Sequence, residues 1–425
     1  MFRIHDDPFR RAQLAIAALF SSLGFQYATW AARLPAIKTH LDLTAAEVGL
    51  LLMATGIGAA AAFPLVAVLM RRWGSRRLAL AAALGLALLL LVLAEAPNYP
   101  VALLIMAVDG ALVACLNVAM NAQGAELEVT YERNAMSRLH ATFSGGSLAA
   151  ALLASGMNTV TSTVIVHFGV AAVLLVLLAA YARPGLLARE RSAGATADAA
   201  AAAEAAAEAA AAPDAPDAPE APKKKTRAKW TLPAAMTLWM GAAMAFGTVT
   251  EGAMNDWSAI YLKDVAKASA ELAPLGIAVV SGMMVLARLF ADGWRSRWGD
   301  ARIVRIGSAL AGVGLAVALL TGGVVPALIG FACVGLGIAA VTPCVYVAAA
   351  SQGSDALTLV ATMGTVGLLA GPPVIGFIAN ASGLVWGMGA VAASAIVVSL
   401  CSTRIGWPAP HAATDPDPVD DPLTA

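Results

Sequence analysis

The residue types that could do chemistry in this chain are a few ionisable and polar side chains set within long apolar stretches. The first is Glu251, and polar residues recur around it at intervals of three or four positions, at Thr248, Asn255 and Ser258. This spacing predicts that they share one face of a helix. A carboxylate in a low-dielectric cleft favours its protonated form, so Glu251 could bind and release a proton. Alternatively, Glu251 pairs with a neighbouring donor and is structural.

Asp109 is the second candidate for binding a proton. It lies within an apolar stretch, and Asn117 and Asn121 follow eight and twelve residues later, on roughly the same helical face. Their amide groups donate and accept hydrogen bonds, which suits the hydroxyl groups of a sugar. Structural roles stay open for all three residues, because polar side chains also join helices within membranes.

A third polar face carries Gln26, Trp30 and Arg33, which are four and three residues apart. An aromatic ring beside an amide fits the apolar face and the hydroxyl edge of a sugar ring. Trp30 could equally belong to the aromatic belt at a membrane surface. Tyr346, shortly after Pro343, is a further candidate for lining a cavity. The predicted ligand-binding residues are Gln26, Trp30, Asn117, Asn121, Asn255 and Tyr346.

The elements that must position these side chains are helices long enough to cross a membrane. Of the 425 residues, 60% are hydrophobic and only 13% are charged, and the mean hydropathy is +0.76. The apolar residues form runs of about 20, the length that crosses the hydrocarbon core of a bilayer. Twelve such runs lie at 12–34, 46–70, 78–95, 100–124, 136–158, 162–182, 231–257, 272–294, 303–321, 324–349, 355–379 and 384–403.

The sequence lacks the motifs of several kinds of enzyme and metal site. The chain has no P-loop, no cluster of His, Cys and acidic residues at metal-ligand spacing, and no Ser-His-Asp set in a soluble domain. The four cysteines, Cys115, Cys333, Cys344 and Cys401, all lie in apolar runs and are interpreted as small packing residues. We therefore expect no enzyme activity, metal, cofactor or nucleic-acid partner.

The basic residues predict how the chain crosses the membrane. With the N-terminus inside, 23 of the 27 Lys and Arg residues lie on the cytoplasmic side. We therefore expect a multi-pass inner-membrane protein with both termini in the cytoplasm. Residues 1–182 and 231–404 form two bundles, 183–230 form a low-complexity cytoplasmic linker, and 405–425 form a disordered cytoplasmic tail.

The two predicted bundles repeat each other in sequence. Similar segments recur in the same order and at nearly constant separation, which predicts two pseudo-symmetric six-helix halves with a solute site at their interface near the bilayer midplane. The matched segments are Trp30 to Gly49 with Trp257 to Gly276, RWGSRR at 72–77 with RWGDAR at 297–302, and ATF at 141–143 with ATM at 361–363.

Two six-helix bundles, a charged central linker and a Gly- and Arg-rich loop after the second helix resemble the major facilitator superfamily. In the loop motif, Gly74 and the flanking arginines fit, whereas Ala67 and Arg71 replace the usual Gly and Asp. Four further segments resemble a bacterial branch of that superfamily related to fucose permease. They are WAARLPAIK at 30–38, NVAMNAQGAELE at 117–128, MSRLHATFSGG at 136–146 and EGAMNDWSAIYL at 251–262.

The resemblance implies an all-α polytopic membrane protein with twelve transmembrane helices in two pseudo-symmetric six-helix bundles. It also implies proton-coupled sugar uptake and a gating loop of Arg72, Gly74, Arg76 and Arg77. Fucose permease similarly uses an acid on the fourth helix with an Asp on the first, but Gln26 and Tyr27 occupy that part of the first helix here. Arg288 and Asp292, four residues apart, are predicted to form a local pair with a gating role.

We therefore expect a secondary active transporter that moves a small polar solute, a sugar or a sugar derivative, by proton-coupled alternating access. A proton-driven exporter is the alternative, although drug antiporters of this superfamily typically carry a Gly-Pro motif on the fifth helix, which Ser144-Gly145-Gly146 lacks. A sensor or scaffold would need an interaction domain, which the linker and tail do not supply. The expected partners are the solute, the proton and the lipid bilayer, and we expect a monomer.

Overall fold

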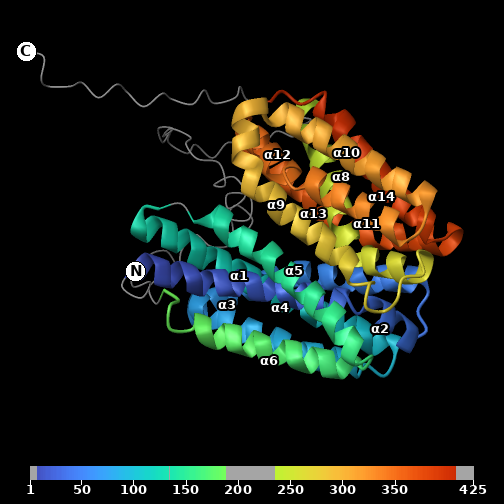
Figure 1. Ribbon diagram of the computed structural model, residues 1–425. Coiled ribbons are helices and arrows are strands. Elements are labelled where there is room, and N and C mark those ends of the chain that lie inside the picture. The colour runs from blue at the N-terminus through green and yellow to red at the C-terminus, as the bar shows by residue number, and fades with distance from the viewer. Residues whose placement is uncertain (1–6, 134, 188–234, 408–425) are drawn as a thin grey trace, which may run out of the picture.

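The first half of the molecule is a bundle of long helices. A computed structural model describes residues 7–133, 135–187 and 235–407, and within these the secondary structure is helical (Figure 1). The helices of the first half are α1 (Pro8–Ala31), α2 (Leu34–His40), α3 (Ala45–Ala94), α4 (Tyr99–Tyr131), α5 (Met136–Val160) and α6 (Val164–Ala182).

The second half has the same kind of architecture. Residues 188–230 of the predicted linker and 408–425 of the predicted tail lie outside the described residues. The helices of the second half are α8 (Ala235–Ile260), the π-helix η1 (Tyr261–Val265), α9 (Leu275–Trp298), α10 (Asp300–Thr321), α11 (Val324–Ile338), α12 (Val341–Ala350), α13 (Ser354–Ser382) and α14 (Leu384–Ser402).

The twelve predicted spans correspond to these helices, but at two places the boundaries between helices differ from the boundaries between spans. Helix α3 contains both the second and the third span. Gly74 separates the two spans, because its backbone conformation is not helical and the helix kinks there. The tenth span is divided into α11 and α12. Pro343 has no amide hydrogen to donate to the carbonyl of Ala339, four residues earlier, so the helix breaks just before it.

The helix starts follow from local sequence. Asp7 accepts a hydrogen bond from the amide of Phe9 at the start of α1, where Pro8 supplies a preset backbone angle. At the start of α3, Thr44 and Glu47 form a capping box in which each side chain bonds the backbone amide of the other. These caps satisfy amides that the first turn of a helix leaves without partners.

Two pairs of helices make the most extensive contacts between the halves. Helix α3 packs on α13, and α5 packs on α9, so that each pair joins one helix from each half. Small residues allow the α3–α13 contact: a Cβ atom added at Gly49 would lie only 2.8 Å from the carbonyl oxygen of Pro372. The halves lie closest at the end that carries α2, and they diverge toward the end where α1 begins (Figure 1).

The sequence repeat is visible in the backbone. Gly74 has φ 71° and ψ 163°, and Gly299, at the matching position of the second half, has φ 76° and ψ 152°. Trp30 and Trp257 also match, with 1% and 0% of their surfaces exposed. The two halves therefore use the same turn between their second and third spans and the same buried aromatic residue at the end of their first.

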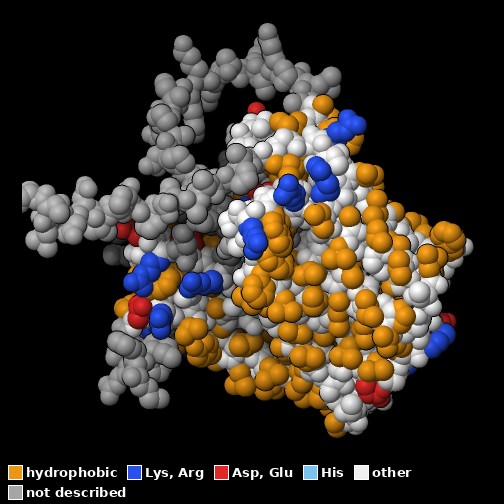
Figure 2. Space-filling model, turned by 45° about the horizontal axis from the view of Figure 1, so that its top comes forward, with side chains coloured by type: hydrophobic (Ala, Val, Ile, Leu, Met, Phe, Trp, Pro, Cys, Tyr) orange, Lys and Arg blue, Asp and Glu red, His pale blue; other side chains and the backbone are white. Residues whose placement is uncertain are grey.

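The outer surface is apolar over a wide area. Figure 2 shows hydrophobic side chains covering one broad face, with Lys and Arg at its margins. Among the described helices, eight are long and apolar enough to cross a membrane, with α3 counted once. Helices α5, α8 and α9 fall outside this group, and they carry polar side chains at the contact between the halves. Exposed apolar side chains of this extent fit a lipid environment.

We predict that Gly74→Ala lowers the free energy of unfolding by about 1–3 kcal/mol, because its backbone conformation is nearly restricted to glycine. The measurement is denaturant-induced unfolding in detergent, followed by circular dichroism. Gly169→Ala in α6 is the control, since an added Cβ there would meet nothing within 4 Å. An equal effect of both substitutions would contradict the assignment of strain to Gly74.

Candidate functional site

Two neighbouring residues of α1 each bond a carboxylate from a different helix. The amide nitrogen Nε2 of Gln26 donates to Oδ1 of Asp109 on α4, at 2.7 Å. The hydroxyl of Tyr27 donates to Oδ1 of Asp256 on α8, at 2.5 Å. Because α4 belongs to the first half and α8 to the second, α1 connects one acid from each half at their interface.

Both carboxylates are buried without a cation. Asp109 is 3% exposed and Asp256 is 4% exposed, and within the described chain neither lies in an ion pair. Oδ2 of Asp109 and Oε1 of Gln26 are buried and have no hydrogen-bond partner there. Burial of an ionised carboxylate without a counter-charge is costly, whereas a protonated carboxyl group is far cheaper to bury. These positions are therefore suited to groups that bind and release protons.

Tyr27 lies within electrostatic range of three acids. Its hydroxyl interacts electrostatically with Asp256, Glu251 and Asp109. Its ring packs edge-on against Trp30, with ring centroids 5.0 Å apart. One phenol thus bonds a carboxylate of the second half and lies within electrostatic range of Asp109 in the first.

Neither Tyr27 nor Asp256 belongs to the residues that the sequence predicts for the site. The polar helical face drawn through Glu251 continues to Asn255 and Ser258, and Asp256 lies off that face. The available signal was an acid inside the seventh apolar run, because acids within membrane spans are rare and usually have a function. No spacing in the sequence indicates that its partner is Tyr27, 229 residues earlier.

Glu251 contacts Arg288 rather than standing alone. Nη2 of Arg288 on α9 lies 3.5 Å from Oε1 of Glu251, and Nη1 donates to Oγ of Ser144 on α5 at 2.6 Å. Arg288 therefore connects the two halves at a second point. The side chain of Asp292, its predicted partner, lies outside the described residues.

Arg288 and Glu251 are more accessible than the two buried aspartates. Their side chains are 29% and 30% exposed. An ion pair that is one-third exposed is screened by water and contributes little to stability. Both charged groups are thus partly accessible at the contact between the halves, unlike the buried pairs on α1.

The other predicted ligand-binding residues occupy different environments. Nδ2 of Asn121 donates to Oδ1 of Asn117 at 2.6 Å, and Nδ2 of Asn255 donates to the carbonyl of Glu251 at 3.2 Å. Trp30 is fully buried, so it does not form part of an interfacial belt. Tyr346 on α12 is also buried.

The predicted gating loop is joined to its own half. Nη2 of Arg76 donates to the carbonyl of Arg183, just after α6, at 2.8 Å. Arg72 and Arg77 are exposed, and Gly74 makes the turn between them. In this conformation, the described hydrogen bonds of the loop stay within the first half.

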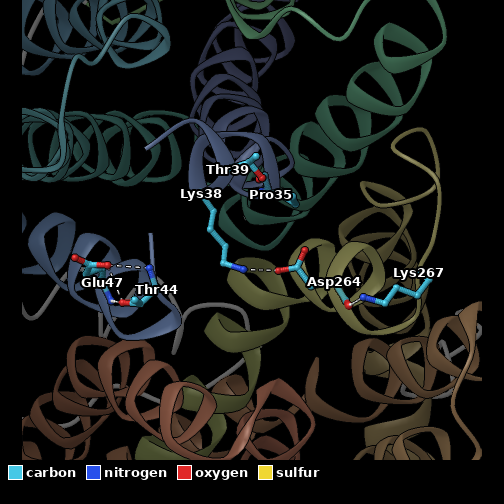
Figure 3. Close-up of polar contacts among 7 residues, drawn as sticks. All are labelled: Pro35, Lys38, Thr39, Thr44, Glu47, Asp264 and Lys267. Atoms are coloured by element: carbon cyan, nitrogen blue, oxygen red, sulfur yellow. Dashed lines mark hydrogen bonds and ion pairs between the residues drawn. The ribbon is translucent and has the colours of Figure 1, made fainter. Parts of the chain in front are cut away.

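A group of polar contacts joins the halves at the end that carries α2. Nζ of Lys38 on α2 lies 2.5 Å from Oδ2 of Asp264 in η1, and Lys267 also donates to the carbonyl of Asp264 (Figure 3). Nearby, the side chains of Ser155 and Asn158 on α5 donate to backbone carbonyls in the segment between η1 and α9.

The opposite end lacks such connections in the described part of the chain. Near the start of α1, the ion pair of Arg133 with Asp7 lies within the first half, and that of Arg295 with Asp300 lies within the second. The polar contacts between the halves therefore close the structure at the α2 end of the interface.

Among the residues that the structure describes, no group of acids, His and Cys could hold a metal ion.

These features define a class of protein: a helical membrane transporter with two similar halves and a polar site between them. The family model of the Major Facilitator Superfamily matches residues 14–354, and the chain belongs to this superfamily. Its members are transporters, so the chain is a multi-pass membrane transporter and not an enzyme. The predicted fold class and family resemblance are confirmed.

Individual relatives agree with this assignment. An uncharacterised MFS-type transporter of Yersinia pestis is 31% identical over 405 residues, covering 92% of this chain and 95% of its own. A bacterial homologue of the lysosomal transporter Spinster has a similar structure, with a TM-score of 0.68, 14% identity and coverage of 95% and 100%. The Escherichia coli fucose:proton symporter FucP has a TM-score of 0.57 at 15% identity, with the same coverage.

We predict that Gln26→Leu lowers the free energy of unfolding by about 1–3 kcal/mol, because it removes the hydrogen-bond donor of a buried carboxyl group. The measurement is chemical unfolding in detergent of Gln26→Leu, Asp109→Leu and the double variant. The double variant should lose less stability than the sum of the single variants, because they remove the same interaction. Strict additivity would contradict a direct Gln26–Asp109 interaction.

Proposed function

We propose that the chain couples the movement of a small polar solute, a sugar or sugar derivative, to a proton by alternating access. The observation that supports this most directly is that neighbouring residues of α1 bond one acid from each half, Gln26 bonding Asp109 and Tyr27 bonding Asp256. A site that touches both halves changes whenever the halves move relative to each other. Protonation at such a site can therefore influence which end of the interface is open.

In this proposal Asp109 and Glu251 bind the transported proton. Within the described chain the hydrogen-bond partner of the buried Asp109 is the uncharged Gln26, whereas Glu251 is partly exposed beside Arg288. The solute binds between the halves, near the partly exposed Glu251 and Arg288. The amide groups of Asn117 and Asn255 can hydrogen-bond its hydroxyl groups. Neutralising an acid with a proton lowers the cost of enclosing it, so proton and solute can cross together.

The orientation is part of the proposal. Basic residues concentrate at the ends of the helices where α1 begins and α14 ends, and this supports assigning that side to the cytoplasm and the chain to the inner membrane. The closed α2 end then faces away from the cytoplasm, and the structure corresponds to an inward-facing conformation. The loop with Arg72, Gly74, Arg76 and Arg77 lies on the cytoplasmic side, where we propose that it takes part in gating.

The fucose:proton symporter supports the choice of solute class and coupling ion, although its 15% identity indicates a shared fold alone. Export of a small molecule is the other direction that the same proton chemistry could drive. A transport assay with an imposed gradient distinguishes these directions.

We predict that right-side-out membrane vesicles accumulate one of the radiolabelled sugars fucose, galactose or glucose when an inward proton gradient is imposed. For one proton per sugar, the limit is about tenfold accumulation per unit of pH difference. Asp109→Asn, which resembles a permanently protonated acid, should equilibrate the sugar without accumulating it. The measurement is the ratio of internal to external sugar at steady state.

The matched control is Asp300→Asn, which makes the same chemical change outside the site, where Asp300 pairs with Arg295. It should accumulate the sugar like the wild type after correction for expression. Equal accumulation with and without the gradient would contradict proton coupling. Gradient-driven efflux from inverted vesicles, without uptake by right-side-out ones, would favour export.

A further inference from the structure

Asp256 has the properties of a switch at the end of the interface that is closed here. It lies on α8 in the second half, and its hydrogen-bond partner in the described chain is Tyr27 on α1 in the first half. Separation of the halves at this end would break that bond and expose both groups to water. The environment of this acid therefore differs between the closed and open forms more than that of an acid bonded within one half.

The closed form places Asp256 where a negative charge is unfavourable. The side chain is 4% exposed, and no Lys, Arg or His within the described residues lies at ion-pair distance. One hydrogen bond from a neutral hydroxyl offsets only part of the cost of removing a carboxylate from water. A protonated Asp256 avoids this cost and can still accept the hydrogen of Tyr27 through its carbonyl oxygen.

We infer that Asp256 must take up a proton before the α2 end of the interface closes, so that protonation of this acid drives closure by removing the cost of burying its charge beside Tyr27. The proton comes from the water at that end and returns to water when the halves separate. The inference rests on the proposed proton coupling and adds to it a third acid, one that controls a conformational change.

Two of the basic groups on elements packed against α8 have acidic partners other than Asp256. Lys38 on α2 and Asp264 in η1 bind each other, and Arg288 on α9 contacts Glu251 and Ser144. Other titratable or charged side chains lie on the elements that pack against α8. They are Arg10, Arg11 and Tyr27 on α1, His40 on α2, Tyr261 and Lys263 in η1, Arg295 and Arg297 on α9, Cys333 on α11, Cys344 and Tyr346 on α12, Asp355 on α13 and Cys401 on α14, and the side chain of Asp292 on α9 lies outside the described residues.

A charged Asp256 would reverse the expected pH dependence. If the carboxylate were ionised in the closed form, its hydrogen bond to Tyr27 would be charge-assisted and strong. Protonation would then weaken the contact and favour opening. Acid conditions therefore increase the closed population under our inference and decrease it under this alternative.

The experiment measures the distance between spin labels on Cys introduced at Thr39 and Ser269, which are exposed on opposite sides of the closed end. The full chain is used in lipid nanodiscs between pH 5 and pH 8, without solute and with the four native cysteines replaced by alanine. The ratio of closed to open molecules should rise as the pH falls, by at most about tenfold per pH unit for one proton. Asp256→Asn should stay predominantly closed and lose this pH response.

The matched control is Asp264→Asn, which removes an acid at the same interface whose side chain is 36% exposed. It should lower the closed population but keep the pH response, because Asp256 is intact. Tyr27→Phe should do the same, and Asp256→Ala is a second test if the asparagine variant does not fold. A full pH response in Asp256→Asn, or a closed population that falls in acid, would overturn the inference. Since no solute is present, the result does not depend on whether the tested sugars are transported.

Discussion

The cost of placing a charge away from water is the constraint on which the rest of this structure depends. The apolar surface keeps the chain in the membrane, so each ionisable group in its interior needs a partner, a proton or access to a cavity. The acids meet this requirement differently. Asp109 is buried beside the neutral donor Gln26, and Asp256 beside the neutral donor Tyr27. Glu251 is instead partly exposed beside Arg288. The first arrangement favours a neutral carboxyl group, and the second leaves a charged pair partly exposed.

The pseudo-symmetry of the halves explains where these groups meet. The first span of each half ends in a buried tryptophan, Trp30 or Trp257, and continues into a short helical extension, α2 or η1. These equivalent extensions meet at the closed end, where one carries Lys38 and the other carries Asp264. Opposite charges on equivalent segments join the halves only weakly, since the pair is partly exposed. A weak connection suits an interface that must open and close.

The sequence predicts the fold well because membrane spans have a strong and local signal. Twelve apolar runs and the repeated RWG loops were enough to predict two six-helix halves, and Gly74 and Gly299 show that the repeat extends to backbone conformation. The site was harder to predict. Helical spacing identifies which side chains share a face, as it does for Glu251 and Asn255, but it does not identify partners on other helices. The pairs Tyr27–Asp256 and Arg288–Ser144 join residues 229 and 144 positions apart, so only the packing of the two halves shows them.

The central claim is that a proton moves together with the solute, and the most direct measurement is the external pH of lightly buffered, de-energised vesicles after a transported sugar is added. The account predicts a transient rise in external pH in the wild type, because protons enter with the sugar down its gradient. It predicts no such rise in Asp109→Asn, even where the sugar still equilibrates. Entry of the sugar into wild-type vesicles without any change in external pH would contradict proton coupling.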